Sequence, residues 1–304
     1  MTKAVKLNKE QEGKLQQLIE SIPKILKRLD HPEYDEIFGY RINTGEHVIE
    51  AIRDEILLKF LIANNYDVNV TIDKLVGTMN WRYEFQPLSA AFNETFPKEL
   101  NDLGVITSFP EAKDNYKIST WNLYGNIKDP KLLFEEYGDS SKVKGSRFLR
   151  WRIGLMEQSL SLARFDDPTN HKIAQVHDYK GVSFFRPDKN MRQATKEIIK
   201  IFGDNYPELL TTKFFVNIPS IMSWMFNFFT SIGIISKDTL DKFRPLNHGN
   251  LTQWFDKSWL PKPYGGELKS IFDLNVEGKI PEYGKIILEK YSKEWANDIS
   301  LSVD

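Results

Sequence analysis

The sequence predicts an α/β fold in which a helical N-terminal unit precedes a lobe built on a mixed, largely parallel sheet. In the first hundred residues, Leu and Ile recur at three- and four-residue steps, which is typical of amphipathic helices. From about residue 104, short runs rich in Val, Ile and Phe alternate with helical segments. These runs are apolar on both faces, as parallel strands covered by helices are.

Helices are predicted over residues 9–29 and over residues 50–85, the latter divided by the turn NNYDVN at residues 64–69. Asn69 and Thr71 are the expected N-caps of the helix that follows this turn. No strand pattern competes in this part of the chain. The helical unit is therefore expected to contain helices alone.

The boundary is expected at the end of the stretch FQPLSAAFNETFPKEL, which divides a unit of residues 1–98 from a lobe of residues 99–304. The lobe's predicted strands and helices follow in alternation. Strands are expected at 104–109, 116–126, 173–185 and 213–218, and helices at 147–165, 191–203 and, closing the chain, 278–299.

Residues 214–235 carry no charge and approach the length of a membrane span. Asn217 and Pro219 interrupt the stretch, and a proline favours the start of a helix. We therefore predict a buried strand followed by an unusually apolar helix, and no transmembrane segment.

Composition excludes several classes of function. The formal net charge is −1, so nothing in the overall charge favours nucleic acid as a partner. The chain has no cysteine, which excludes disulfides, a thiolate nucleophile, Cys-ligated zinc and iron–sulfur clusters. The N-terminus, MTKAVKLNKEQEGKLQ, is too polar for a signal peptide, so a cytoplasmic protein is expected.

The stretch AQVHDYKGVSFFR combines a buried-strand composition with two polar aromatic side chains. Alternate side chains of a strand share one face, so His177, Tyr179 and Gly181 should point the same way, and Asp178 the other. Taken alone, such a pair is more often a hydrogen-bonded part of the core than a ligand set. Left without partners, each buried group would cost about 1–3 kcal/mol.

Four blocks resemble the CRAL-TRIO, or Sec-fourteen-like, lipid-transfer family. They are LLKFLIANNYDVNVTIDKLVGTMNWR, VHDYKGVSFF, NYPELLTTKFFVNIPSIMSW and LPKPYGGEL, in the family's order, with Pro263 where an acidic residue is common. The resemblance implies that the sheet floors an apolar pocket, which a mobile gate helix roofs and opens at a membrane. The apolar helix IMSWMFNFFTSIGII would be that gate.

WNLYG, RWRIGLME, QVHDYKGVS and YPELLTTKFFVN also resemble a fungal, haem-binding branch of this family. That branch is associated with non-classical phosphatidylinositol transfer and holds ferric haem b in its pocket. Carried over by position, Tyr179 would be the axial iron ligand and His177 would support it. Tyr124, Arg152 and Lys213 would line the site, with both cations facing the haem propionates, and Tyr66 would belong to the pocket wall.

The implied function is haem binding combined with phosphatidylinositol transfer, without enzymatic turnover. Tyr phenolate is an established haem ligand, and a ferric ion favours the deprotonated phenol. Two alternatives remain open: phosphatidylinositol transfer without a physiological haem, and a haem-dependent peroxidase or catalase-like enzyme. The expected partners are haem, phosphatidylinositol as competing cargo, and transient contact with the endoplasmic reticulum or other membranes.

Overall fold

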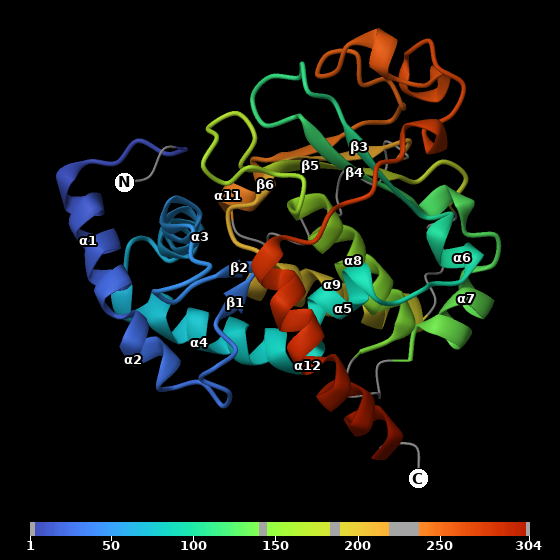
Figure 1. Ribbon diagram of the computed structural model, residues 1–304. Coiled ribbons are helices and arrows are strands. Elements are labelled where there is room, and N and C mark those ends of the chain that lie inside the picture. Colours follow the sequence, from blue (N-terminus) through green and yellow to red (C-terminus); the bar gives the residue numbers. More distant parts are fainter. Residues whose placement is uncertain (1–3, 140–144, 183–188, 219–236, 302–304) are drawn as a thin grey trace.

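The computed structural model describes residues 4–139, 145–182, 189–218 and 237–301 (Figure 1). The predicted gate helix and the end of the predicted strand 173–185 lie outside these residues. None of the described helices is long and apolar enough to cross a membrane.

Helices dominate the first hundred residues, as predicted. They are α1 (Lys9–Glu20), α2 (Ile22–Leu26), α3 (Glu50–Ala63), α4 (Val68–Phe85), α5 (Pro87–Phe92) and α6 (Lys98–Asn101). Apolar side chains of α1, α3 and α4 form one core cluster with residues of the sheet and its covering helices, among them Ile118, Ile153 and Ile173. The division at residue 98 stays a prediction, because this core continues across it.

Two details of this region differ from expectation. The short strands β1 (Glu36–Ile37) and β2 (Tyr40–Arg41) form an antiparallel hairpin where only helices were predicted, since a two-residue strand leaves no periodic pattern. Asp67 caps α4, with its carboxylate accepting from the backbone N–H groups of Asn69 and Val70. Asn69 and Thr71 are therefore not the caps; the Thr71 hydroxyl instead donates to the Asp67 carbonyl.

The lobe contains a five-stranded mixed sheet in the order β3–β4–β5–β6–β7, which confirms the predicted fold class. Its strands are β3 (Gly104–Ser108), β4 (Ile118–Leu123), β5 (Ile173–Asp178), β6 (Leu210–Val216) and β7 (Phe243–Pro245). β3 pairs antiparallel with β4, and all other pairs are parallel. Three parallel strands, β4 to β6, therefore end at the same edge.

The two faces of the sheet have different covers (Figure 1). On one face, Trp121, Val176 and Phe214 pack against the segment that contains Phe255 and Tyr264. The other face meets α8 (Arg147–Leu160) and α9 (Lys189–Asn205). Helices α7 (Pro130–Tyr137), α11 (Lys237–Leu240) and α12 (Glu282–Leu301) complete the elements that frame the sheet.

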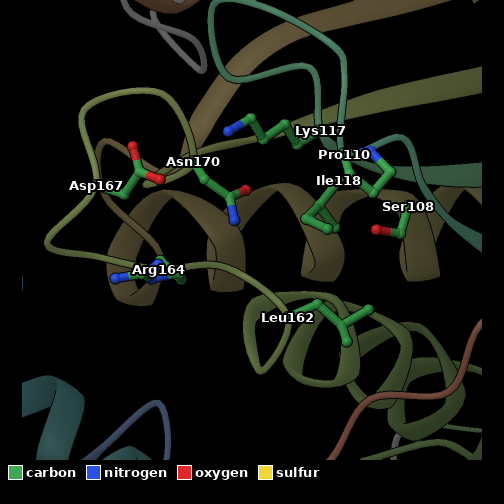
Figure 2. Close-up of a pocket in the computed structure, with 8 residues that line it drawn as sticks. All are labelled: Ser108, Pro110, Lys117, Ile118, Leu162, Arg164, Asp167 and Asn170. Carbon is green, nitrogen blue, oxygen red and sulfur yellow. The ribbon is translucent and has the colours of Figure 1, made fainter.

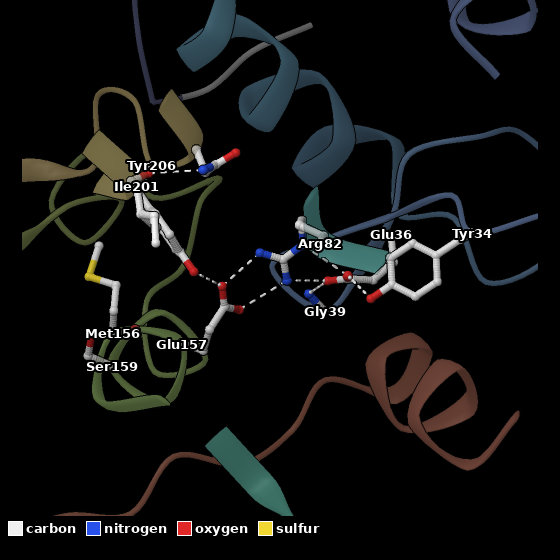
Figure 3. A network of polar contacts seen from close by, with 10 residues as sticks. Tyr34, Glu36, Gly39, Arg82, Met156, Glu157, Ser159, Ile201 and Tyr206 are labelled. Carbon is white, nitrogen blue, oxygen red and sulfur yellow. Dashed lines mark hydrogen bonds and ion pairs between the residues drawn. The ribbon is translucent and has the colours of Figure 1, made fainter. Parts of the chain in front are cut away.

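A buried polar network joins the N-terminal helices to α8 (Figure 3). Arg82 is fully buried and pairs with Glu36 at 2.8 Å and with Glu157 at 2.7 Å. The Tyr206 hydroxyl donates to Glu157 at 2.6 Å, and the Tyr34 hydroxyl donates to Glu36 at 3.2 Å. Every nitrogen of the Arg82 guanidinium has a carboxylate partner.

Candidate ligand site at the ends of the parallel strands

The predicted site residues come from consecutive elements of the lobe. Tyr124 begins the short helix η1 (Tyr124–Asn126) directly after β4, and Tyr179 follows directly after β5. Because these parallel strands end at the same edge, the ring centroids of Tyr124 and Tyr179 lie 5.5 Å apart. The ring of His177 also lies 5.5 Å from that of Tyr124. Carboxyl ends of parallel strands are the usual ligand edge of α/β sheets.

Glycines allow the two strand ends to approach. A Cβ atom on Gly125 would lie 2.2 Å from the Lys180 carbonyl oxygen, so only glycine permits η1 to pass this turn. Gly181 does not continue the strand, as expected from alternation, but lies in a turn with φ +84°. Nothing in the described structure lies within 4 Å of a Cβ atom placed there, which leaves space beside Tyr179.

Arg152 on α8 is the most unusual group of the site. Its residue surface is fully buried, yet none of its guanidinium nitrogens makes a hydrogen bond of ordinary geometry within the described residues. It lies 4.8 Å above the ring of Phe202 on α9, and the Tyr124 phenol is close enough to act as a weak hydrogen-bond acceptor that favours its charge. Burial lowers the pKa of Arg152. An unpaired buried charge costs several kcal/mol, so the sequence keeps this cation at the expense of stability.

His177 is also buried with one ring nitrogen that makes no hydrogen bond within the described residues. Its Nε2 atom has no hydrogen-bond partner, and its side chain is enclosed by the rings of Tyr124 and Phe215. Burial, and then the charges of Lys213 and Arg152, lower its pKa well below the ordinary value. The imidazole is therefore neutral at physiological pH and adds hydrogen-bonding capacity without charge.

Lys213 lies inside β6 rather than at its start, and its Nζ atom makes no ion pair or hydrogen bond within the described residues. It lies 5.4 Å from the ring centroid of Phe215 and 5.7 Å from that of Phe243. Burial and the nearby Arg152 lower the pKa of Lys213 to about 7. Aromatic faces contribute roughly 0.5–2 kcal/mol to holding a cation, which does not replace an anion.

The two tyrosines remain protonated in the absence of a positively charged ligand. Burial raises the pKa of Tyr179, and the Tyr124 phenol raises it further, while Arg152 opposes this shift. Burial likewise raises the pKa of Tyr124, again opposed by Arg152. A deprotonated phenol at Tyr179 would therefore require an additional cation, such as a ferric ion.

The charges of the site do not balance among the described residues. Arg152 and Lys213 face a neutral imidazole and two neutral phenols, and no carboxylate bonds to either cation. No three His, Asp or Glu side chains converge as ligands for a bare metal ion in the described part of the chain. The arrangement is suited to binding an anionic molecule that has a flat aromatic ring system.

Tyr66 does not join this group. It follows α3, and its pKa is raised by burial and by the carboxylate of Glu208, which precedes β6. Glu208 accepts hydrogen bonds from Lys172 at 3.3 Å and from Lys242 at 3.1 Å. The amine of buried Lys59 donates to the Glu208 carbonyl, and burial lowers its pKa to about 7. Tyr66 therefore lies beside a cluster of three lysines around one carboxylate, at the opposite ends of the strands.

Sequence analysis missed three residues of the site. Phe202 forms the platform under Arg152, and Thr120 and Asn122 place polar atoms on the sheet face beneath α8. The helical spacing of α9 marks Phe202 only as a core residue. Thr120 and Asn122 could have been found from the sequence, because they alternate with Trp121 in a strand that is otherwise buried on both faces.

Two cavities of the described structure lie elsewhere. One, of about 280 Å³, is lined by Ser108, Ile118 and Asn170 among others, at the other end of the sheet (Figure 2). The second, of about 530 Å³, lies between α5, α8 and the segment around Asn275. Neither is lined by a predicted site residue.

Comparison with known proteins places this chain in a family. Residues 122–266 match the CRAL/TRIO domain, the stretch that carries Tyr124, Arg152, His177, Tyr179 and Lys213. The phosphatidylinositol transfer protein SFH5 of Candida albicans is 57% identical over 99% of this chain and 96% of its own length. The protein of the same name from Scheffersomyces stipitis is 58% identical over 98% of this chain and 93% of its own.

The fold has a solved relative as well. A crystal structure of Sfh5 superposes with a TM-score of 0.85 and 35% sequence identity, covering 95% of this chain and all of that one. Identity at this level over nearly the whole length implies common descent and not a shared architecture alone. The chain belongs to the CRAL-TRIO, Sec14-like family, among the relatives of the SFH5 phosphatidylinositol transfer proteins.

Proposed function

We propose that this protein binds ferric haem through Tyr179 and exchanges phosphatidylinositol at membranes. The observation that carries the haem proposal is Arg152, a fully buried guanidinium that no carboxylate of the described residues pairs with and that makes no hydrogen bond of ordinary geometry there. In a core that binds no ligand, a buried charge of this kind would be paired with an opposite charge or replaced by an apolar residue. A cargo that brings its own anionic groups explains why it is kept.

The residues fit haem in charge and in kind. A ferric porphyrin core carries one positive charge, which a phenolate at Tyr179 would neutralise. Its propionic acid groups would lie at the two cations, Arg152 and Lys213. Phe202, Phe215 and Tyr124 supply aromatic surface for a flat ring system.

Within the site, each side chain has a separate task. Tyr179 would provide the axial oxygen, and Arg152 would stabilise its deprotonated form as it already opposes the rise of the Tyr179 pKa. His177, neutral and with a free Nε2, would hydrogen-bond close to the ligand. A bound haem would supply a ferric centre; the protein's contribution is to hold and orient it.

Lipid transfer rests on a second observation. The relatives are named phosphatidylinositol transfer proteins, and the single carboxylate of Glu208 pairs with two lysines, Lys172 and Lys242, so that one positive charge of this group is uncompensated. Lysine amines are suitable partners for a phosphate group. We infer that a phosphatidylinositol headgroup binds at this cluster, formed by Lys59, Lys172 and Lys242, when lipid is the cargo.

The decisive experiment is the absorption spectrum of the purified protein after equilibration with hemin. Wild type should show a Soret band and the charge-transfer bands of tyrosinate-bound ferric iron, and Tyr179→Phe should lose the latter. Tyr264→Phe is the matched control, because Tyr264 is a buried phenol on the opposite face that donates to Asp178. Unchanged spectra in Tyr179→Phe would refute the assignment of the ligand.

A peroxide assay separates binding from the enzymatic alternative. We expect no steady-state peroxide consumption above that of free hemin, because His177, on the strand that ends directly before the ligand Tyr179, would not be free to act as an acid or base on the opposite face of the haem. Turnover that requires Tyr179 would instead establish the haem-dependent enzyme.

A further inference from the structure

Two polar side chains of β4 face the covered side of the sheet beneath α8. Thr120 and Asn122 alternate with Trp121 and Leu123, which pack in the cluster on the opposite face. Asn122 is the register partner of His177, and Thr120 that of Gln175. The pair therefore extends the surface of the proposed cargo site inward from His177 along the strand.

Both side chains are completely buried, and each leaves one polar atom without a hydrogen bond. These atoms are the Thr120 hydroxyl oxygen and Asn122 Oδ1. They lie on the same sheet face as His177 Nε2, which is also without a partner, and α8 brings the three unpartnered nitrogens of Arg152 to this face. Buried polar atoms without partners are rare in proteins, so six of them at one face call for a common cause.

The chemistry of the missing partner follows from the orientation of Asn122. Its amide nitrogen donates to the Val176 carbonyl at 3.4 Å, which leaves Oδ1 as a hydrogen-bond acceptor facing inward. An acceptor needs a donor, which the oxygens of an ionised carboxylate cannot supply. The Thr120 hydroxyl can accept or donate. A cargo group that carries an O–H would therefore satisfy both side chains.

We propose that Thr120 and Asn122 form an extension of the cargo site that recognises an O–H group at the buried end of the cargo. Arg152 and Lys213 hold the anionic oxygen at that end, and the β4 pair binds the hydroxyl beside it. In haem, this chemistry is one ionised and one protonated propionic acid beside each other. This inference rests on the haem site of the proposed function.

The extension has a measurable consequence for the empty protein. Without cargo, two buried polar atoms lose their hydrogen bonds to water and gain none from the protein. Replacing each side chain by an apolar one of the same shape removes that cost. Such replacements should therefore raise the stability of the empty protein and lower its affinity for cargo. Replacing a residue with a purely structural role should change stability and affinity in the same direction.

The test compares Thr120→Val and Asn122→Leu with Ser119→Ala as matched control. Ser119 is equally buried and also has an unpartnered hydroxyl, but it points to the opposite face of the same strand. Thermal unfolding without cargo and equilibrium binding of hemin are measured for each variant. Both test variants should unfold at a higher temperature and bind hemin about tenfold more weakly, the loss of about one hydrogen bond. The control should keep wild-type affinity.

A second arm identifies the group that is recognised. Hemin dimethyl ester lacks the O–H, so wild type should bind it more weakly than hemin, and Asn122→Leu should show less of this discrimination. Wild type that binds no hemin would refute the haem proposal, on which this inference rests. Wild type that binds hemin, with the same affinity as both variants, would overturn this inference alone. Thr120→Val keeps the test valid should Asn122→Leu not fold.

Discussion

At the scale of single residues, the site consists of groups whose pKa values are shifted by burial. Lys213 has a pKa of about 7, His177 has a pKa well below its usual value, and the pKa of Tyr179 is raised. Each shift favours the neutral form, as burial requires. An anionic cargo with a ferric centre would reverse the shifts of Lys213 and Tyr179, so that loading exchanges protons with solvent.

The pH dependence of loading follows from Lys213. Below about pH 7 its amine is charged in both the empty and the loaded protein. Above about pH 7 the empty protein loses this proton, and the cargo's anionic oxygen restores it, so loading takes up one proton. The ratio of wild-type to Lys213→Met affinity for hemin should be constant from about pH 6 to 7 and fall about tenfold per pH unit from 7 to 9.

Lys213 also predicts how the stability of the protein changes with pH. Because the unfolded lysine, with its usual pKa near 10.4, binds a proton that the folded amine has released, the empty wild type should gain stability relative to Lys213→Met between about pH 7 and 10. Titration of both proteins with urea across this range measures the difference. If the difference in unfolding free energy between the two proteins did not change with pH, Lys213 would have an anionic partner in the empty protein.

At the scale of elements, two of the three buried charged residues of α8, Glu157 and Arg152, differ in how they are paired. Glu157 is paired with Arg82 and hydrogen-bonded by Tyr206, whereas Arg152, little more than one turn earlier, has no partner. The first anchors α8 to the N-terminal helices (Figure 3). The second faces the sheet, where the cargo site is proposed. One helix therefore combines the anchor and the cargo contact.

This contrast predicts opposite effects of one substitution at two fully buried arginines. Arg152→Met should increase the free energy of unfolding of the empty protein by about 1–3 kcal/mol, because an uncompensated polar group disappears. Arg82→Met should decrease it by about 3–5 kcal/mol, because two buried carboxylates lose their partner. Chemical denaturation measures both. Equal destabilisation by the two would show that Arg152 is satisfied without cargo.

Sequence patterns predicted the longer elements well and the short ones poorly. The strands at β3, β4 and β6 and the helices α3, α4 and α8 were expected because hydrophobic periodicity is strong over many residues. The hairpin β1–β2 was missed because its pairing comes from tertiary packing of buried Glu36 against Arg82. Asp67 was missed as the cap of α4 because Asn69 and Thr71 also carry side-chain oxygens that can cap a helix.

At the scale of the whole molecule, the two predicted cargo positions lie toward opposite ends of the same parallel strands. The haem position is at the carboxyl ends, beside Tyr124 and Tyr179, and the lysine cluster lies around Glu208, before β6 begins. A phospholipid whose headgroup binds the cluster would have its acyl chains directed into the space that the haem would occupy. We therefore expect the two cargoes to compete.

Competition is tested by vesicle transfer assays with and without preloaded hemin. Preloading should reduce phosphatidylinositol transfer in proportion to the fraction of protein loaded, because one space cannot hold both molecules. Lys242→Gln should lower transfer several-fold and leave hemin binding at the wild-type level, since Lys242 contacts only Glu208 among the charged groups described. Transfer that is independent of hemin would show two separate cargo spaces.

By itself, the sequence determined the fold class and the family, because periodicity and local motifs are properties of neighbouring residues. The resemblance to that family supplied the candidate residues Tyr124, Arg152, His177, Tyr179 and Lys213. Tertiary structure alone decided which of them have partners. It brings Tyr124, Tyr179 and Arg152 together from three elements, and it places Tyr66 beside Glu208 instead. Whether a buried charge or amide is satisfied depends on atoms distant in sequence, and that is why Thr120 and Asn122 became visible only in the folded chain.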